Sequence, residues 1–496
     1  MKKYLIISCV AAGLLTFSSC DSFLDINQDP NNITDDKLTA DMVYPAAELV
    51  YASYTGDQLR YLGGFLCEHY MQAVGSTNYQ NLSAFNLTDL PDAIYSAQYI
   101  RSLANLATVR DKASESGNWA TFLAATVMRA ATFQLLADCW GEAPYSESLN
   151  GEISAPAFDS DKEIYAGIIA ELNNAISRIS DTNQSAATSF LVPNGKAADW
   201  IKVANALKLK ILMREHNAVD VSDALEALIN EDNFPTADVQ WAGCWANASG
   251  KANPFFSEEM SSWGRATHQC ILNVALGNTM SAYNDARLPV YFTPGSGASG
   301  VFYGSISGAV MNTAPDPYNQ NILYATPIVN YDTPVSFISL AEIEFFLAEY
   351  YADNGNISEA QTHYQNAIEA SFSSAGVSGA DAAIKAWPLT ADNYQEAIGV
   401  QKWVHLSGVN PYEAWCELRR LGYPAFAEVT GGDLYDGTSV QTDNLQPGYI
   451  YTPAGVYTQV GANKLIQRFD YPLSIKQINP NVPTFKGFTT PLFWAK

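Results

Sequence analysis

Apolar residues recur three and four positions apart over most of the chain, which is the spacing of one face of an α-helix. The clearest example spans residues 197–214, where Trp200, Leu207 and Ile211 fall on one side. We expect that side to be buried and the opposite side to face solvent. The lysines predicted on the solvent side are Lys202, Lys208 and Lys210. The same spacing predicts helices over residues 38–74, 91–112, 118–140, 160–179, 337–353 and 358–372.

The segment 118–140 differs from the other predicted helices because it is apolar on nearly every side. A helix without a polar face lies between other helices or in a membrane. No stretch after the first 20 residues reaches the length of about 18 apolar residues that a membrane span needs. Gly141 and Pro144 follow the segment, as at an ordinary helix end. We therefore expect a buried core helix here.

Residues 337–372 carry the pattern of a helical hairpin that resembles a tetratricopeptide unit. Its characteristic positions are Leu347, Ala348 and Tyr351 on the first helix, Gly355 at the turn, and Ala360, Tyr364 and Ala367 on the second. Small residues allow the two helices to approach closely, which stacked pairs require. Hairpins predicted over residues 118–179, 197–230 and 391–421 could be degenerate copies. The expected fold class is mainly α, with a scaffold of tetratricopeptide-like hairpins.

Between about residues 232 and 335 the helical spacing is lost, and Gly, Pro, Asn, Ser and aromatic residues alternate irregularly. Residues 425–496 are loop-rich in the same way. Long irregular segments carried on a regular scaffold are usually functional. We therefore expect the region 232–335 to face a ligand.

The first 20 residues have the pattern of a bacterial lipoprotein leader. Lys2 and Lys3 precede an apolar stretch, and small residues lead directly to Cys20. This pattern predicts a signal peptide over residues 1–19, acylation of Cys20, and a polar tether over residues 20–37. The alternatives are an ordinary secretory cleavage site or a core cysteine. The lipid would be the protein's only attachment to the membrane.

The chain is acidic, with 27 Lys and Arg against 51 Asp and Glu and a net charge of −24. Its longest basic run is Arg419-Arg420. Nucleic-acid binding normally needs a basic surface, so we expect no nucleic-acid partner. Charged residues make up only 16% of the chain, which leaves much of the polar surface to amides, hydroxyls and tyrosines.

Five cysteines remain after Cys9 and Cys20, and none forms a CxxC pair. Three of them lie in helical apolar patterns and are predicted to be buried thiols: Cys67, Cys139 and Cys416. Cys244 and Cys270 lie in loop-like sequence and could form a disulfide.

Motifs for catalysis and for cofactors are missing from the sequence. It has no HExxH, no GxSxG, no phosphate-binding glycine loop and no EF-hand loop. The acidic pairs Glu258-Glu259 and Glu342/Glu344 could be catalytic carboxylates, but coincidental pairs are expected among so many acids. We therefore expect no catalytic residue, no cofactor and no metal.

Aromatic residues are the remaining candidates for ligand contact. Flat rings can stack on the apolar face of a sugar or a peptide side chain, while nearby amides bind its polar groups. The candidates are Tyr79, Trp241, Trp245, Trp263 and Tyr303. The alternative for each is that it holds a long loop against the scaffold.

Several segments together resemble the SusD/RagB family of outer-membrane lipoproteins of the Bacteroidota. They are LADCWGEAPYSESL (136–149), DWIKVANALKLKILMRE (199–215), DARLPVYF (285–292), SLAEIEFFLAEYYADNG (339–355), NPYEAWCELRRLGYP (410–424) and RFDYPLSIKQINP (468–480). They occur in family order over nearly the whole chain after Cys20.

The resemblance implies one SusD-like domain over residues 38–496, with a scaffold at 38–231 and 336–424. It also implies a non-catalytic protein at the outer membrane, facing the cell exterior. Such a protein binds a glycan or peptide and delivers it to a SusC-like TonB-dependent transporter. The family's ligand contacts vary, so none is carried over to this sequence. The alternatives are a surface glycosidase or peptidase, or a structural tetratricopeptide-type adaptor.

Overall fold

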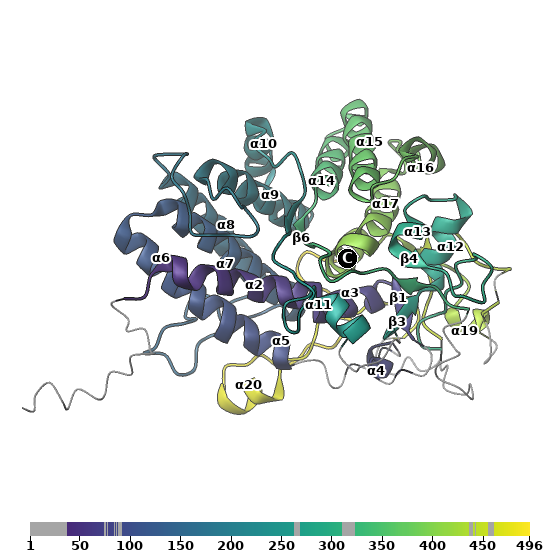
Figure 1. The fold of residues 1–496 in the computed structure, drawn as a ribbon, viewed down its shortest axis with the longest axis horizontal. Helices are drawn as coiled ribbons and strands as arrows, with labels where there is room; N and C mark the ends of the chain where they lie inside the picture. The colour runs from purple at the N-terminus through teal and green to yellow at the C-terminus, as the bar shows by residue number, and fades with distance from the viewer. Residues whose placement is uncertain are drawn as a thin grey trace, which may run out of the picture.

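The structure is a computed structural model that describes residues 37–73, 76, 78–83, 85, 87, 92–261, 268–309, 323–435, 440–441, 443–454 and 461–496. Cys20, the predicted leader and nearly all of the tether lie outside these ranges, as does Trp263. A large group of helices occupies one part of the molecule, and loops with short strands and helices occupy the other (Figure 1).

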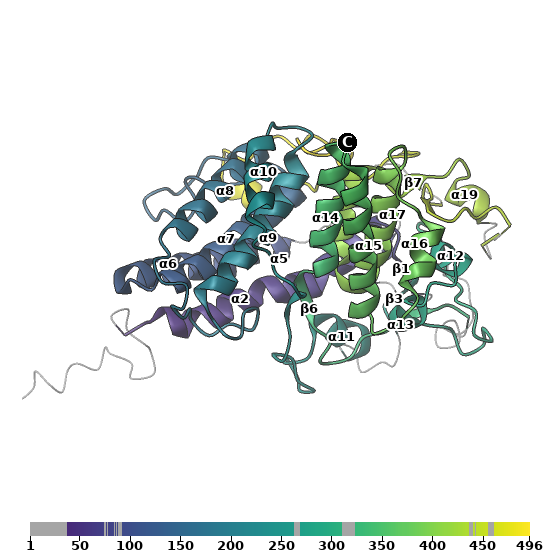
Figure 2. The same cartoon turned by 90° about the horizontal axis from the view of Figure 1, so that it is seen from above.

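The helical part confirms the predicted fold class. Its helices are α2 (Ala40–Gly56), α3 (Gln58–Leu66), α5 (Asp92–Ala97), the π-helix η1 (Gln98–Leu103), α6 (Ala104–Ser116), α7 (Trp119–Trp140), α8 (Asp161–Ser177), α9 (Ala197–Glu215), α10 (Ser222–Glu231), α14 (Leu340–Asp353), α15 (Ile357–Ser374), α16 (Ala380–Ala386), α17 (Tyr394–Val409) and α18 (Pro411–Leu421). Helix α7 packs against α8 and α9, α14 against α15 and α17, and α18 against α3. Figure 2 shows α14, α15 and α17 side by side.

Helix α7 is the predicted core helix. Asn118 caps its first turn by accepting a hydrogen bond from the backbone N–H of Thr121, and Gly141 follows its last residue with φ +87°. Within the described ranges it is the one helix long and apolar enough to cross a membrane, and almost all of it is buried inside the protein. That burial is typical of the core helix of a globular domain.

The helical hairpin predicted over residues 337–372 is formed by α14 and α15. Ser339 and Glu342 form a reciprocal capping box that begins α14, and Gly355 makes the turn with φ +76°. The rings of Tyr351 and His363 stack across the pair at 5.2 Å. The prediction was wrong for Phe337 and Ile338, which belong to strand β6, and for Ser339, which is the N-cap of α14.

The helix predicted over residues 38–74 is interrupted, and its end is a strand. Asp57 has φ −125° and ψ −96° and separates α2 from α3, and β1 covers Tyr70–Gln72. A Cβ on Gly63 would lie 2.4 Å from the backbone of Pro411, so the glycine permits the close contact of α3 with α18. The spacing of apolar residues does not reveal the break or the strand. A continuous helix and the observed helix, break and strand would bury apolar residues alike.

A network of charged side chains lies buried where α7, α9, α14, α17 and α18 meet. Arg214 contacts Asp138 at 2.6 Å, Glu417 at 3.1 Å, and Glu413. Lys402 contacts Glu417 at 2.8 Å. Burial raises the pKa of Glu417, but the nearby Arg420, Lys402 and Arg214 outweigh it and hold that pKa well below the usual range.

The prediction that Lys210 faces solvent was wrong. Its side chain is buried, and its Nζ lies 3.6 Å from Glu413 Oε2. The longest basic run, Arg419-Arg420, is also fully buried. Arg420 contacts Glu349 at 2.6 Å through Nη1 and again through Nη2. Charged residues of the scaffold therefore lie in its core, where they form ion pairs, as well as on its surface.

The loop-rich part is organised by short strand pairs. They are β1 with β3 (Cys270–Leu272), β2 (Val239–Trp241) with β6 (Val335–Ile338), β4 (Phe292–Thr293) with β5 (Thr326–Pro327), and the parallel pair β7 (Ala425–Phe426) with β8 (Tyr449–Ile450). Short helices lie between and after them: α4 (Gln80–Ser83), α11 (Pro254–Phe256), η2 (Ser257–Ser261), α12 (Val274–Ala282), α13 (Leu288–Tyr291), α19 (Gly431–Leu434) and α20 (Leu473–Ile478). The sequence did not predict the nine-residue helix α12.

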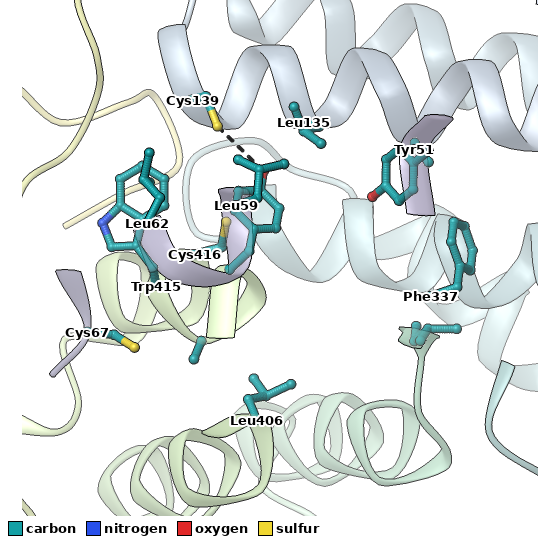
Figure 3. Packing of buried hydrophobic residues seen from close by; sticks show 14 of the residues in the cluster. Tyr51, Leu59, Leu62, Cys67, Leu135, Cys139, Phe337, Leu406, Trp415 and Cys416 are labelled. Carbon is teal, nitrogen blue, oxygen red and sulfur yellow. Dashed lines mark hydrogen bonds between the residues drawn. The ribbon is translucent and has the colours of Figure 1, made fainter. Parts of the chain in front are cut away.

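The thiols of the described residues are all free. Cys67, Cys139 and Cys416 are buried among apolar side chains, as predicted (Figure 3), and Cys139 lies 3.9 Å from the hydroxyl of Tyr412. The disulfide considered between Cys244 and Cys270 is not formed. Cys270 is buried against Glu259, whereas Cys244 is half-buried.

Candidate ligand-binding site

The centre of the candidate site is Tyr79, which stacks on a second tyrosine from the scaffold. Its ring lies 4.4 Å from that of Tyr61 in α3, with 16° between the planes. Tyr61 is 1% exposed, and its other neighbours include Phe65 and Phe255. Tyr79 itself is half-buried. A buried aromatic support therefore holds a half-buried tyrosine, an arrangement that suits ring stacking.

The loop that carries Tyr79 is tied to the small sheet by side-chain amides. Gln269, directly before β3, accepts hydrogen bonds from Ser76 Oγ at 2.9 Å and from Asn78 Nδ2 at 3.0 Å. Gln72, in β1, donates to the carbonyl of Ser76. These bonds fix the position of Tyr79 before a ligand arrives, and that lowers the entropic cost of binding.

Acidic side chains flank the tyrosine pair. Glu259 is 1% exposed and accepts from Tyr61 at 2.5 Å, from His268 Nδ1 at 3.0 Å and from the backbone of Gln269 at 3.0 Å. The hydroxyl of Tyr79 donates to Glu258 at 3.3 Å. Burial raises the pKa of the Tyr79 hydroxyl, and Glu258 adds to this, so the group stays a hydrogen-bond donor.

Asp57 lies close to the same carboxylates. Burial, followed by repulsion from Glu258 and Glu259, raises the pKa of Asp57 to about 7. The group therefore changes charge near neutral pH, and a protonated Asp57 can donate a hydrogen bond.

Tyr303 is the most exposed of the described candidates. It is 43% exposed, and its carbonyl accepts from the backbone N–H of Ala325 at 2.9 Å. The bridge between Asn273 and Ser305 ties its segment to the end of β3. Tyr79 and Tyr303 thus lie on segments held by opposite ends of one short strand.

Two of the three candidate tryptophans belong to the described residues and lie in or shortly after β2. Trp241, in β2, is 0% exposed and donates from Nε1 to Glu48 at 2.7 Å, so its interpretation as a ligand-facing residue was wrong. Trp245 is half-buried and donates to the carbonyl of Trp241 at 3.1 Å. Trp241 packs on Tyr51 of α2, whereas Tyr79 packs on Tyr61 of α3. A tryptophan in irregular sequence can therefore be part of the core.

Sequence reasoning missed the support of the platform. Tyr61 and Phe65 are spaced as i and i+4 in α3, which predicts a buried helical face and nothing more. Only the tertiary contact with Tyr79 makes them part of the site.

One group of side chains in the described part of the chain has the types and spacing that could hold a metal ion: His216, Glu349 and Asp353. Both oxygens of Glu349 already contact Arg420 at 2.6 Å. His216 donates from Nδ1 to the carbonyl of Met213 at 2.7 Å, and its Nε2 lies 3.0 Å from Asp353. Burial opposes protonation, but Asp353 and Glu349 raise the pKa of His216 overall. These contacts describe a closed ion-pair cluster.

Comparison with known proteins gives the family. A family model described as "Starch-binding associating with outer membrane" matches residues 30–441. The chain belongs to the SusD-like family. The SusD-like fold extends over about nine tenths of the chain, since a solved SusD homologue covers 91% of it. The family is one of glycan-binding proteins associated with the outer membrane. No curated protein sequence matches the chain.

Solved structures share this SusD-like fold. A SusD homologue from Bacteroides uniformis is 21% identical, with a TM-score of 0.71 and coverage of 91% of this chain and 98% of its own. A structure described as a chitin-binding protein is 20% identical, with a TM-score of 0.69 and coverage of 91% and 99%. A SusD-like protein from Bacteroides thetaiotaomicron is 18% identical, with a TM-score of 0.67 and coverage of 90% and 98%.

Proposed function

We propose that this protein binds an oligosaccharide at the cell surface and delivers it, unchanged, to a SusC-like TonB-dependent transporter. In this proposal residues 1–19 are a signal peptide, Cys20 carries the lipid anchor, residues 20–37 are a tether and residues 38–496 form one ligand-binding domain. The observation that carries the proposal is the supported ring of Tyr79.

The chemistry around Tyr79 favours a sugar ligand. A sugar ring has an apolar face that can stack on an aromatic ring, and hydroxyls that need both donors and acceptors. Asn78 is exposed next to Tyr79, and Glu258 is half-buried beside it. Tyr303 and the half-buried Trp245 are proposed as further contacts, and Trp263 remains a proposed contact outside the described residues.

The hydrogen bonds of the buried Glu259 support a protein that binds its ligand without converting it. Glu259 is held by donors from Tyr61, His268 and Gln269, which is the environment of a structural carboxylate. A general acid or base needs an oxygen within reach of the substrate. We therefore propose no catalytic residue at this site.

Calorimetry of the purified protein against oligosaccharides of starch and of chitin, and against a peptide panel, tests the ligand class. We expect an oligosaccharide to bind, and Tyr79→Ala to weaken binding by roughly ten-fold because it removes a stacking contact. The matched control is Tyr350→Ala, which removes a half-buried tyrosine of α14. The centre of its ring lies 5.4 Å from that of Tyr351. Binding of peptides alone, or equal effects of both variants, would contradict the proposal.

The anchor and the partner need a separate experiment in cells. We expect the wild-type protein to carry acyl groups on Cys20, to be cleaved by protease added to intact cells, and to co-purify with a large outer-membrane transporter. Cys20→Ala should abolish acylation and membrane retention. A wild-type chain recovered without acyl groups from the periplasm would overturn this part of the proposal.

A further inference from the structure

A pocket lies where α12 meets α16 and α17, and its lining does not include Tyr79 or Tyr61. Figure 1 and Figure 2 both show α12 next to α16. The pocket is a partly open hollow with a cavity volume of about 80 Å³. Its floor is apolar and includes Met280, Phe372 and Val404, which are side chains of α12, α15 and α17.

Two aromatic rings form a corner at this pocket. Tyr283 is 40% exposed, and its ring lies 5.7 Å from that of Trp387 with 70° between the planes. Such a corner can receive the face of a small ring against one wall and its edge against the other.

Trp387 is held rigidly. A Cβ on Gly448 would lie 2.2 Å from Cη2 of the Trp387 ring, so the glycine, with φ +83°, permits the backbone to lie directly on the ring. The carbonyl of Trp387 accepts a hydrogen bond from the hydroxyl of Tyr364 at 2.6 Å. The ring therefore needs little ordering when a ligand binds.

An amide nitrogen at the pocket has no protein acceptor among the described residues. Gln401 lines the pocket and is 2% exposed. Its Oε1 accepts from Nη2 of Arg287 at 3.1 Å. Since a guanidinium only donates, this bond fixes which amide atom is the oxygen, and Nε2 is left as the free donor. This nitrogen keeps access to the free space of the pocket, so a ligand oxygen placed there would accept a hydrogen bond from it.

The charges at the pocket already neutralise each other. Asp285 accepts from Nε of Arg287 at 3.0 Å and from Nη2 at 2.6 Å. Arg287 also donates to Ser371 at 2.8 Å. The pocket thus offers an incoming ligand rings, an amide donor and the exposed Asn284 at its mouth, and no unpaired charge among these residues.

We propose that this pocket is a second binding site and takes one residue of a neutral sugar. The apolar face of the sugar would stack in the corner of Tyr283 and Trp387, and one of its oxygens would accept from Gln401 Nε2. The choice of a sugar over another neutral ring rests on the proposed function. The site itself is built from different elements than the Tyr79 platform and does not depend on it.

The test is saturation-transfer NMR on the purified protein with methyl glycosides of glucose, galactose and N-acetylglucosamine. We expect at least one glycoside to bind, and Tyr283→Ala to weaken its binding by roughly five-fold or more. Gln401→Glu keeps an oxygen toward Arg287 and replaces the free donor with a second oxygen, so it should weaken binding. Because it also adds a negative charge beside Asp285 and Arg287, thermal unfolding of the variant checks that the fold is kept. The matched control is Tyr331→Ala, because Tyr331 is 37% exposed and also has a T-shaped aromatic partner, Phe256, at 6.4 Å.

The same titration in a Tyr79→Ala, Tyr303→Ala background separates the two sites. Glycoside binding that persists there and is lost on adding Gln401→Glu supports the second site, even if the Tyr79 proposal fails. Binding that disappears with the Tyr79 and Tyr303 changes and ignores Tyr283→Ala and Gln401→Glu overturns it. The absence of glycoside binding, or displacement of the glycoside by N-acetyl-leucinamide at lower concentration, also overturns it.

Discussion

The helical part and the loop-rich part of this protein pair their buried polar groups in different ways. In the helical part, Arg214, Lys402 and Arg420 are buried against carboxylates in one connected network. In the loop-rich part, amides such as Gln269 and Gln72 hold the backbone of the Tyr79 loop. A charge network tolerates little change because each missing partner leaves a buried charge. Amide-tied loops tolerate more, so a rigid scaffold can carry a binding surface that varies.

The largest expected effect comes from breaking the charge network. Arg214→Met leaves Asp138 and Glu413 without their arginine, and we expect a loss of about 3–5 kcal/mol in the free energy of unfolding. Urea unfolding at neutral pH measures this loss. The control is Lys112→Met, which breaks the surface pair of the half-buried Lys112 with the exposed Glu115 and should cost less than about 0.5 kcal/mol. Similar losses in both variants would remove the distinction between the two regions.

A second change acts where the regions join, at Glu68 between α3 and β1. Burial raises the pKa of Glu68 from 4.5 to about 8, while its Oε2 accepts from the backbone of Tyr451 at 3.0 Å. The unfolded chain releases this proton above pH 4.5 and the folded chain holds it until about pH 8. Stability is therefore present at low pH and is lost as the pH rises through this window.

Glu68→Gln should remove that loss. We expect the variant to be more stable than the wild type by about 3 kcal/mol at pH 7 and equally stable at pH 4. Urea unfolding at several pH values measures the difference, with the exposed Glu115→Gln as control. A difference that does not grow with pH would show that Glu68 is already charged in the folded protein.

A third prediction concerns the ion pair at the edge of the helical part. The pKa of His216 is raised, so the pair with Asp353 stabilises the protein below pH 6.5 and is lost as the pH rises through the folded-state pKa. The charged groups around His216 are Asp353 and Glu349 of α14 and Arg420 of α18. His216→Gln should cost about 1 kcal/mol at pH 6 and less at pH 9.

Thermal unfolding across this pH range measures the effect. Asp353→Asn is the complementary variant, because it removes the acceptor and should abolish the same pH dependence. A cost of His216→Gln that stays constant with pH would mean that the neutral imidazole, and not the ion pair, carries the contribution.

The smallest expected effect on stability is that of Tyr303→Ala in the loop-rich part. This side chain is 43% exposed, so its loss should change the free energy of unfolding by less than about 0.5 kcal/mol. Oligosaccharide binding, measured by calorimetry, should weaken by several-fold in the same variant. A large loss of stability would mean that Tyr303 supports the fold, as Trp241 does.

The failures of sequence reasoning have one physical origin. The residue type of Lys210 and of Trp241 does not determine whether the side chain is buried. Lys210 is buried beside Glu413, and Trp241, in irregular sequence, packs on Tyr51. The strand at residues 70–72 was missed because a short buried strand and the end of a buried helix have the same apolar composition.

The sequence by itself determined most of the long helices and the tetratricopeptide-like hairpin, because helical spacing and the turn at Gly355 act within a few residues of each other. It also indicated a loop-rich half and the family. Only the tertiary structure decided which rings face outward, which charges pair in the core, and that Gln401 and Tyr283 line one pocket. These properties depend on contacts between segments far apart in the chain, and no local pattern records such contacts.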